Sequence, residues 1–503
     1  MVTVTVSSRR SRGRGGSRKS PGNELANLAT PEPPATFRDH QARLVERDRV
    51  EWRVGDGGDP AAALTAFLAR HGLPTDLAAP STPPPGAAAA AALLVGAAGA
   101  ATLAGAAPGA PSPVPAVPDL CVVAYDLAPP VAAPPNPASP DAALPAGPPS
   151  AALPARLPGG ALPAGPPGGA LPAGPPSGAL PGGAPGAGRP ADPAAVEPGG
   201  FAEGEGGAGS TAAWPDRPGR RREDAEAFRV GRWAGSWTDH EHAAAVRMVR
   251  AAIADGEVYQ VNVVGHRTAP YAGDPAAALA AVAALPGATY GGGLGGPGWA
   301  VVTASPECLL TVERGVARTR PVKGTRPATA AGRAELLASA KERAEHVMIV
   351  DLARNDLGRL AVAGTVQVEE LFGLREWCGL WQAESTVAAR LRPGTGLAEL
   401  LAAVLPGGSV TGAPKLAATA LAAALEPVGR GPAMGALGTL TADRLDLGLT
   451  IRTVATDGER LHLWAGGGIT WGSDPAAEVA EAHAKAAPVL AALSSRAAEP
   501  HRG

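Results

Sequence analysis

Hydrophobic residues follow two different periods from residue 216 to the C-terminus. Where they recur every three to four positions, the pattern predicts an amphipathic helix, and where they alternate or form short unbroken runs, it predicts a strand. Strand pairs joined by short turns between long helices predict an α+β fold, with helices covering mixed or antiparallel sheets. The predicted helices are 239–255, 333–357, 414–425 and 474–493, and the predicted strands are 258–267, 299–303, 309–313, 316–320, 365–371, 450–456 and 461–465.

The first 215 residues have a different pattern. Residues 1–30 carry a cluster of arginines without interleaved aromatics, which predicts a basic disordered tail. Residues 31–78 have mixed charge and one helical pattern at 61–71, and we expect them to form the N-terminal part of the fold. Residues 79–215 are rich in Ala, Pro and Gly, with the segment ALPAGPP repeated, so we expect a disordered low-complexity insertion with one buried strand near 120–127.

Composition and charge narrow the possible partners. The 67 glycines and 54 prolines are about twice an ordinary share, and much of this excess lies in the insertion. The net charge of −2 argues against a globally basic nucleic-acid binder, so we expect no nucleic-acid partner. Residues 87–107 are uncharged but mostly Ala and Gly, which gain little in lipid, so we expect no membrane span. Three cysteines without a CxxC pair fit a reducing compartment, and we expect a cytoplasmic protein.

Two pairs of carboxylates have helical spacing. Glu342 and Glu345 lie three residues apart on one predicted helix, and Glu478 and Glu481 repeat that spacing on the last one, with Lys485 four residues further on. If the two helices face each other, four carboxylates suit a hard divalent cation such as Mg²⁺. Each pair taken alone is more often a solvated helix face with an ordinary ion pair. The residues themselves leave both interpretations open.

Three further segments carry candidate chemistry. Lys323 lies in PVKGTRP, predicted as a turn after a strand, where it is either a desolvated amine nucleophile or an ordinary surface lysine. The glycine-rich turn of PGGSVTGAPK (406–415) runs into a predicted helix N-terminus, a natural site for a carboxylate or phosphate. Gly466, Gly467 and Gly468 follow a predicted strand, and we expect their amides to be free to bind an anion.

Taken together and in order, the motifs resemble those of chorismate-utilising enzymes, the large synthase subunits of anthranilate and 4-amino-4-deoxychorismate formation. This similarity covers about residues 225–495, and it implies a catalytic domain over 216–497. It also implies a four-layer α/β/β/α sandwich with chorismate and Mg²⁺ between the sheets. The motifs are GEVYQVN (256–262), SPE (305–307), PVKGTRP (321–327), KERAEHVMIVDLARNDLGR (341–359), PGGSVTGAPK (406–415), LTIRT (449–453) and GGGI (466–469).

The resemblance assigns expected roles to individual residues. Glu345 and Glu481 would be the main Mg²⁺ ligands, and Glu342 and Glu478 would hold metal-bound water. Arg452 and Lys485 would bind the substrate carboxylates. The full expected substrate-binding set is Gln260, Thr325, Thr411, Gly412, Arg452, Gly466, Gly467, Gly468 and Lys485.

Within this resemblance, the residues at two positions of the sequence indicate which reaction to expect. Relatives that add water carry a lysine where this chain has Gln260, and glutamine is no base for water, so ammonia is the expected nucleophile. The segment around Lys323 is similar to PIKGT of aminodeoxychorismate synthases and unlike PIAGT of anthranilate synthases. In that mechanism Lys323 attacks C2 of chorismate as the C4 hydroxyl leaves, Glu307 is the general acid/base, and ammonia displaces the lysine.

The expected product is 4-amino-4-deoxychorismate, the precursor of 4-aminobenzoate. No cysteine lies in a glutaminase context, so the resemblance implies a separate glutamine amidotransferase subunit that supplies the ammonia. An anthranilate synthase large subunit is the alternative. A non-catalytic protein of the same fold is a second alternative, because Gln382 replaces a histidine and Ala433 an aromatic residue that such enzymes usually carry.

Overall fold

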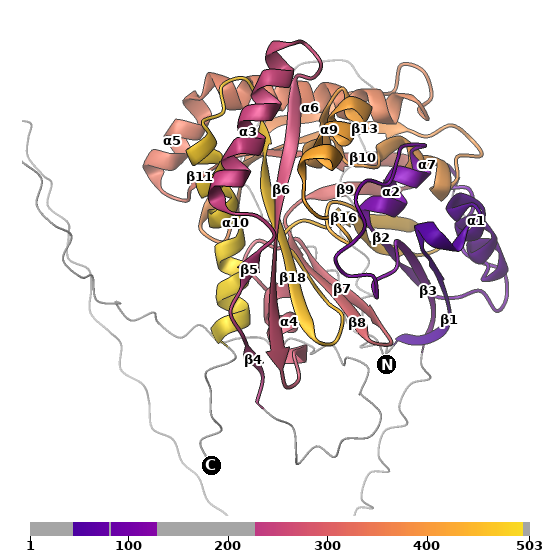
Figure 1. The fold of residues 1–503 in the computed structure, drawn as a ribbon. Helices are drawn as coiled ribbons and strands as arrows, with labels where there is room; N and C mark the ends of the chain where they lie inside the picture. Colours follow the sequence, from indigo (N-terminus) through magenta and orange to yellow (C-terminus); the bar gives the residue numbers. More distant parts are fainter. Residues whose placement is uncertain (1–43, 80–81, 128–226, 496–503) are drawn as a thin grey trace, which may run out of the picture. The chain divides into compact units, whose positions relative to one another are not determined.

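The computed structural model describes residues 44–79, 82–127 and 227–495 (Figure 1). These residues form two β-sheets with helices on their outer faces. The predicted basic tail at 1–30 and the part of the predicted insertion from 128 to 215 lie outside the described residues.

The first sheet joins strands from the two ends of the chain. β1, β2 and β3, indigo in Figure 1, continue the edge formed by β15, and all pairings in the sheet are antiparallel. Its order is β1 (Leu44–Trp52), β3 (Leu120–Leu127), β2 (Ala90–Val95), β15 (Ala436–Leu440), β16 (Arg444–Leu449), β9 (Cys308–Glu313), β10 (Val316–Arg320), β13 (Leu380–Arg390) and β11 (Val322–Pro327), with β12 (Gln367–Trp377) also on β13.

The second sheet comes from the C-terminal part of the chain alone. Its long central pair is β6 with β18, which stay in antiparallel register over ten residue pairs. Its order is β14 (Gly412–Ala413), β6 (Gln260–Ala272), β18 (Arg460–Ile469), β17 (Thr453–Thr456), β8 (Trp299–Ser305) and β7 (Tyr290–Gly296), with β4 (Arg229–Val230) and β5 (Ala234–Gly235) also on β6.

Helices cover the outer face of each sheet, and the main core lies between the sheets. That core joins Leu310 and Leu447 of the first sheet to Val264, Leu294 and Val301 of the second. The predicted α+β fold with four α/β/β/α layers is therefore confirmed. The helices on the second sheet are α3 (Asp239–Ala254), α4 (Ala276–Ala283), α9 (Lys415–Leu425) and α10 (Pro475–Ser495). Those on the side of the first sheet are α1 (Pro60–Arg70), α2 (Ala97–Leu103), α5 (Ala330–Ala338), α6 (Ala340–Gly358) and α7 (Leu397–Val404). The short helices η2 (Val54–Asp56) and α8 (Gly408–Thr411) lie in connections.

Local capping explains where the site helices begin. The Thr238 hydroxyl accepts from the Glu241 N–H, and the Glu241 carboxylate accepts from the Thr238 N–H, which satisfies free donors at the start of α3. The Ser339 hydroxyl accepts from the Glu342 N–H at the start of α6. The prediction of one helix over 333–357 is wrong at this point, because the extended backbone of Ser339 ends α5 and caps α6.

The prediction that the low-complexity insertion starts at residue 79 is wrong for residues 82–127. β2 is buried along its whole length because β3 and β15 pair with its two edges, and its small alanine side chains fit that space. Gly99 in α2 has no room for a side chain, since an added Cβ would lie 2.2 Å from the Asp119 carbonyl oxygen. The strand predicted near 120–127 is confirmed as β3. In the described ranges, no helix has the length and apolar character needed to cross a membrane.

Candidate active site

One cavity is lined by residues from both sheets and from α6 and α10. Gln260, Thr411, Gly412 and Gly467 do not line it. The residues that were expected from the sequence and do line it are Glu307, Lys323, Thr325, Glu342, Glu345, Arg452, Gly466, Gly468, Glu478, Glu481 and Lys485.

Lys323 lies on a strand rather than on the predicted turn. β11 pairs with β13, with Lys323 opposite Ala383, and the register shifts directly after it. The ammonium group is buried and donates to the carbonyl oxygen of Ser409 at 3.0 Å. Burial in the protein lowers the pKa of Lys323 below its usual range, and this favours the neutral amine that a nucleophile needs.

Gln260 lies directly behind the cavity wall, next to Lys323. A Cβ added at Gly468 would be 2.7 Å from the Gln260 Nε2 and 2.8 Å from the Lys323 Nζ, so a side chain at this position would have to displace the ends of both. Both polar atoms of the Gln260 amide are buried without a hydrogen-bond partner in the described part of the chain. The amide therefore lies close to Lys323 with its hydrogen-bonding capacity unused by the described residues.

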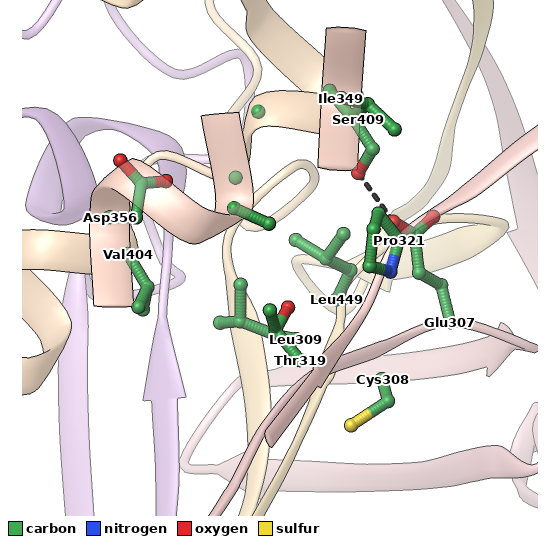
Figure 2. Close-up of a pocket in the computed structure, with 13 residues that line it drawn as sticks. Glu307, Cys308, Leu309, Thr319, Pro321, Ile349, Asp356, Val404, Ser409 and Leu449 are labelled. Atoms are coloured by element: carbon green, nitrogen blue, oxygen red, sulfur yellow. Dashed lines mark hydrogen bonds between the residues drawn. The ribbon is translucent and has the colours of Figure 1, made fainter. Parts of the chain in front are cut away.

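Glu307 is a buried carboxyl with two donors on one oxygen. The Ser409 hydroxyl donates to Oε1 (Figure 2), and the Val322 N–H donates to the same oxygen at 3.3 Å. Burial raises the pKa of Glu307 to about 7, although the Ser409 hydrogen bond and the positive charge of Lys323 act in the opposite direction. A carboxyl that titrates near pH 7 is suited to general acid–base catalysis.

Two carboxylates on α6 and two on α10 line the same cavity, as the helical spacing allowed. Lys341 belongs to α6, and its ammonium group lies 3.7 Å from a Glu345 oxygen of the same helix and 3.8 Å from a Glu478 oxygen of α10. On α10, the Lys485 ammonium lies 2.6 Å from Glu481. The carboxylates are therefore close enough to share counter-charges across the two helices.

Burial and mutual repulsion raise the pKa of two of these groups. The pKa of Glu342 is raised by burial and then by the charge of Glu345, and the pKa of Glu478 is raised by burial and then by Glu481. In the described ranges, no three His, Cys, Asp or Glu side chains stand as a ready-made metal site. The donor set nevertheless fits Mg²⁺ by its chemistry, because it offers four hard, partly buried oxygen ligands whose repulsion a divalent cation relieves.

Arg452 is a buried cation that lines the cavity. Its guanidinium carbon lies 3.5 Å from the centre of the Trp377 indole ring, and its Nη1 has no hydrogen-bond partner among the described residues. Burial lowers the pKa of Arg452 to about 10. An arginine that is stacked on one side and unpaired at Nη1 is prepared to bind a carboxylate that enters the cavity.

The glycines of the GGGI motif lie within a strand. The prediction that they follow the end of a strand is wrong. β18 continues to Ile469, and Gly466, Gly467 and Gly468 stay in register with β6. β17 pairs with β18 only up to Leu463, so within the described residues the other edge of this segment carries no strand. The three glycines thus form a strand edge beside the cavity.

Thr411 and Gly412 have structural contacts instead of cavity contacts. The Thr411 hydroxyl donates to the Gly407 carbonyl oxygen at 2.8 Å. Gly412 has a φ of 136°, and a Cβ there would lie 2.0 Å from the Gln260 carbonyl oxygen. Neither residue is part of the cavity lining, and Gly412 is needed for the close approach of β14 to β6.

Several cavity residues were missed by the sequence analysis, among them Asn262, Lys341, Ser409 and Trp464. Ser409 had a visible signal, because it lies in the glycine-rich turn before a helix.

Gln382 also lines the cavity, and its Oε1 has no hydrogen-bond partner within the described residues. Ala433 is buried in the main core, so its small side chain is a packing feature.

Comparisons with known proteins show similarity over about half of the chain. The chain is 37% identical to aminodeoxychorismate synthase component 1 of Salmonella typhimurium, over 52% of this chain and 60% of that protein. It is 38% identical to anthranilate synthase component 1 of Streptomyces coelicolor, over 52% of this chain and 53% of that protein. The chain thus spans between half and two thirds of the length of these curated relatives.

A solved structure is also similar, that of anthranilate synthase component I from Streptococcus pneumoniae. The identity is 30% and the TM-score 0.48, over 53% of this chain and 60% of that chain. The sequence profile of the chorismate binding enzyme family matches residues 207–491, which is more than half of the chain. The chain therefore belongs to the chorismate binding enzyme family.

Proposed function

We propose that the protein is the large subunit of an aminodeoxychorismate synthase, which converts chorismate and ammonia to 4-amino-4-deoxychorismate for 4-aminobenzoate formation. The observation that carries this proposal is the position of Lys323, a buried amine that lines the cavity and is hydrogen-bonded to the residue that also holds Glu307. Similarity to aminodeoxychorismate synthases component 1 of several bacteria supports it.

In the proposed reaction, the neutral Lys323 amine forms a bond to C2 of chorismate. The ring double bonds shift, the C4–O bond breaks, and Glu307 gives its proton to the departing hydroxyl, which leaves as water. Ammonia then attacks C4, the double bonds shift back, and the bond between C2 and the lysine breaks. The Glu307 carboxylate takes up a proton from the new ammonium group, and both side chains return to their starting states.

The remaining cavity residues bind and orient the substrate in this proposal. Chorismate carries two carboxylates, and Arg452 and Lys485 are the cations of the cavity wall that offset them. Glu345 and Glu481 would hold a Mg²⁺ ion directly, and Glu342 and Glu478 would hold its water. When bound, the cation supplies positive charge that balances the acidic cluster and the dianionic substrate.

A glutamine amidotransferase subunit is the proposed source of ammonia. None of the three cysteines lies in a glutaminase context, and two of them are buried in the described fold. Ammonia is the proposed nucleophile because the neutral Gln260 amide beside Lys323 accepts and donates hydrogen bonds but is no base for water. A second candidate function is that of an anthranilate synthase large subunit, which the similarity to the Streptomyces coelicolor protein favours.

Product analysis separates the two candidates. The full chain is incubated with chorismate, Mg²⁺ and ammonium, with and without a lyase that releases 4-aminobenzoate. We expect 4-aminobenzoate only with the lyase. Fluorescent anthranilate would overturn the proposal in favour of the second candidate, and the absence of turnover would favour a non-catalytic role.

The lysine step has its own test. Intact-mass measurement of the enzyme with chorismate, without ammonium, should show an adduct with the mass of chorismate less water, which peptide mapping places on Lys323. Lys323→Ala and Lys323→Arg should both lose the adduct, the second while keeping a cation of similar length. An adduct that persists in either variant removes Lys323 from the nucleophile role.

A further inference from the structure

A second cavity has Glu307 in its wall. Figure 2 shows Glu307 and Ser409 on one side of it and Asp356 and Val404 on the other. Much of its remaining wall is apolar and includes Leu309, Ile349 and Leu449. Glu307 and Ser409 line the active-site cavity as well, so they form part of the wall between the two spaces.

The Glu307 carboxyl group is held on one oxygen only. Both of its donors, the Ser409 hydroxyl and the Val322 N–H, meet at Oε1, and no donor to Oε2 is found within the described ranges. The Val322 contact is the longer one, at 3.3 Å, which makes it the weaker of the two. The direction of the carboxyl group therefore depends mainly on Ser409.

Ser409 itself is fixed by contacts that do not involve the reacting groups. It lies in α8, where Val410 donates its N–H to the Gly407 carbonyl oxygen and Thr411 donates its hydroxyl to the same atom. The Arg430 guanidinium donates to the Val410 carbonyl oxygen at 2.7 Å. These contacts hold the Ser409 backbone in place independently of Glu307.

The same residue also holds Lys323. Its carbonyl oxygen accepts from the Lys323 ammonium at 3.0 Å, while its hydroxyl donates to Glu307. One residue thus sets the positions of the proposed nucleophile and the proposed acid, the first through its backbone and the second through its side chain. A change of the side chain removes only the second contact.

We propose that Ser409 is a positioning residue that keeps the Glu307 carboxyl group facing the active-site cavity beside Lys323, and prevents it from turning into the second cavity. This inference rests on the proposed function only in taking Glu307 as the acid/base of the reaction. Without the hydroxyl, the carboxyl group has open space behind it and a single, longer hydrogen bond to the backbone.

Ser409→Ala and Ser409→Thr test the proposal, because threonine keeps the hydroxyl that alanine lacks. We expect Ser409→Ala to lower kcat by about 10- to 100-fold, the order of a misplaced general acid, and to leave the KM for chorismate within about threefold. Ser409→Thr should keep kcat within about threefold of the wild type. Ser409→Cys, of similar size and with a weak donor, should fall between the two and serves if the alanine variant does not fold.

The pH profile separates positioning from a general loss of structure. Lys323 and Arg452 are the charged groups that face Glu307, and they remain in all three variants. Since the Ser409 hydrogen bond favours the ionised carboxylate, its loss should move the alkaline limb of the kcat profile to higher pH in Ser409→Ala but not in Ser409→Thr. An infrared titration of the carboxyl band that disappears in Glu307→Gln should show the same shift without any turnover.

Two results would overturn the inference. One is a Ser409→Ala enzyme with wild-type kcat and an unshifted carboxyl titration, and the other is a Ser409→Thr enzyme as impaired as Ser409→Ala. The wild-type product is identified in the same experiment. If it is anthranilate, the proposed function fails while the comparison of the variants still decides the role of Ser409, and if there is no turnover, the infrared titration decides it.

Discussion

The guanidinium group of Arg452 stacks on the indole ring of Trp377, with 3.5 Å between its central carbon and the ring centre. Both side chains are buried, and the Arg452 Nη1 has no hydrogen-bond partner among the described residues. The Trp377 ring is itself held by a hydrogen bond from its Nε1 to the Ala304 carbonyl oxygen. The indole therefore supplies the electrostatic partner that keeps a buried arginine in position before an anion arrives.

Trp377→Leu should weaken chorismate binding, because the arginine loses the ring that orients it. A desolvated cation–π contact of ~2 kcal/mol corresponds to a loss of at most about 30-fold in affinity. Trp377→Phe keeps an aromatic face and should stay within about fivefold of the wild type. Calorimetric titration with chorismate measures both, and a leucine variant that binds like the wild type would rule out this role for the ring.

Glu307→Gln should change the pH dependence of stability. Burial raises the pKa of Glu307 to about 7, so the folded state binds this proton more tightly than the unfolded chain does. The stabilisation is complete below the unfolded pKa of about 4.5 and is lost as the pH rises through about 7. Glutamine cannot titrate. The free energy of unfolding of the wild type should therefore fall by up to roughly 3 kcal/mol relative to that of the variant between pH 4.5 and 8.

Urea unfolding of both proteins at several pH values measures this difference. Glu313→Gln, at the exposed end of β9, is the matched control for removing one carboxylate. If the free energy of unfolding changes with pH by the same amount in the wild type and in Glu307→Gln, Glu307 has an ordinary carboxyl pKa. This result would argue against its proposed role as an acid near neutral pH.

Magnesium should stabilise the protein through the four cavity carboxylates. A ligand that binds the folded state at 100 times its Kd adds about 2.7 kcal/mol, so we expect Mg²⁺ to raise the melting temperature by several degrees and a chelator to reverse this. Glu345→Gln and Glu481→Gln should lose most of the increase. Glu369→Gln, which affects an ion pair with Arg318 away from the cavity, should keep it. An equal response of all four proteins would place the cation elsewhere.

The parts of the fold that are determined by residues close together in the sequence could be predicted from it. The last helix was predicted at 474–493 and spans Pro475–Ser495, because a proline at its first position and its hydrophobic period are both visible in the sequence. The spacing of Glu342 with Glu345 likewise predicted one helix face, and both line the cavity. What it could not show is that a second helix brings Glu478 and Glu481 to the same space.

Elements that exist only through pairing were missed. β11 has one apolar residue among six, and it is a strand because β13 pairs with it, so Lys323 was expected on a turn. β2 is rich in alanine, so its sequence predicts part of a low-complexity segment, although the neighbouring strands bury it completely. Tertiary contacts overrode local propensity in both cases.

Leu94→Ala tests whether β2 is part of the core. Leu94 is fully buried in the first sheet, opposite Leu437 and Cys121, so its truncation should lower the free energy of unfolding by about 2–5 kcal/mol. Leu127→Ala changes the same residue type at the exposed end of β3 and should cost less than about 0.5 kcal/mol. Equal stabilities of the two variants, measured by urea unfolding, would contradict the burial of β2.

Gly466→Ala and Gly468→Ala should separate stability from activity within one motif. A Cβ at Gly466 would lie 2.0 Å from the Val263 carbonyl oxygen, which is backbone and cannot move aside cheaply. We therefore expect Gly466→Ala to lower the free energy of unfolding by about 1–3 kcal/mol or more.

At Gly468, an added Cβ would instead meet the ends of two flexible side chains, the Gln260 Nε2 at 2.7 Å and the Lys323 Nζ at 2.8 Å. These ends can move, so Gly468→Ala should melt within a few degrees of the wild type. The displaced Lys323 should then cost about 100-fold in kcat, the order expected for a shift of about 1 Å in a reacting group. A Gly468→Ala enzyme with wild-type kcat would show that the reaction does not depend on the observed position of Lys323.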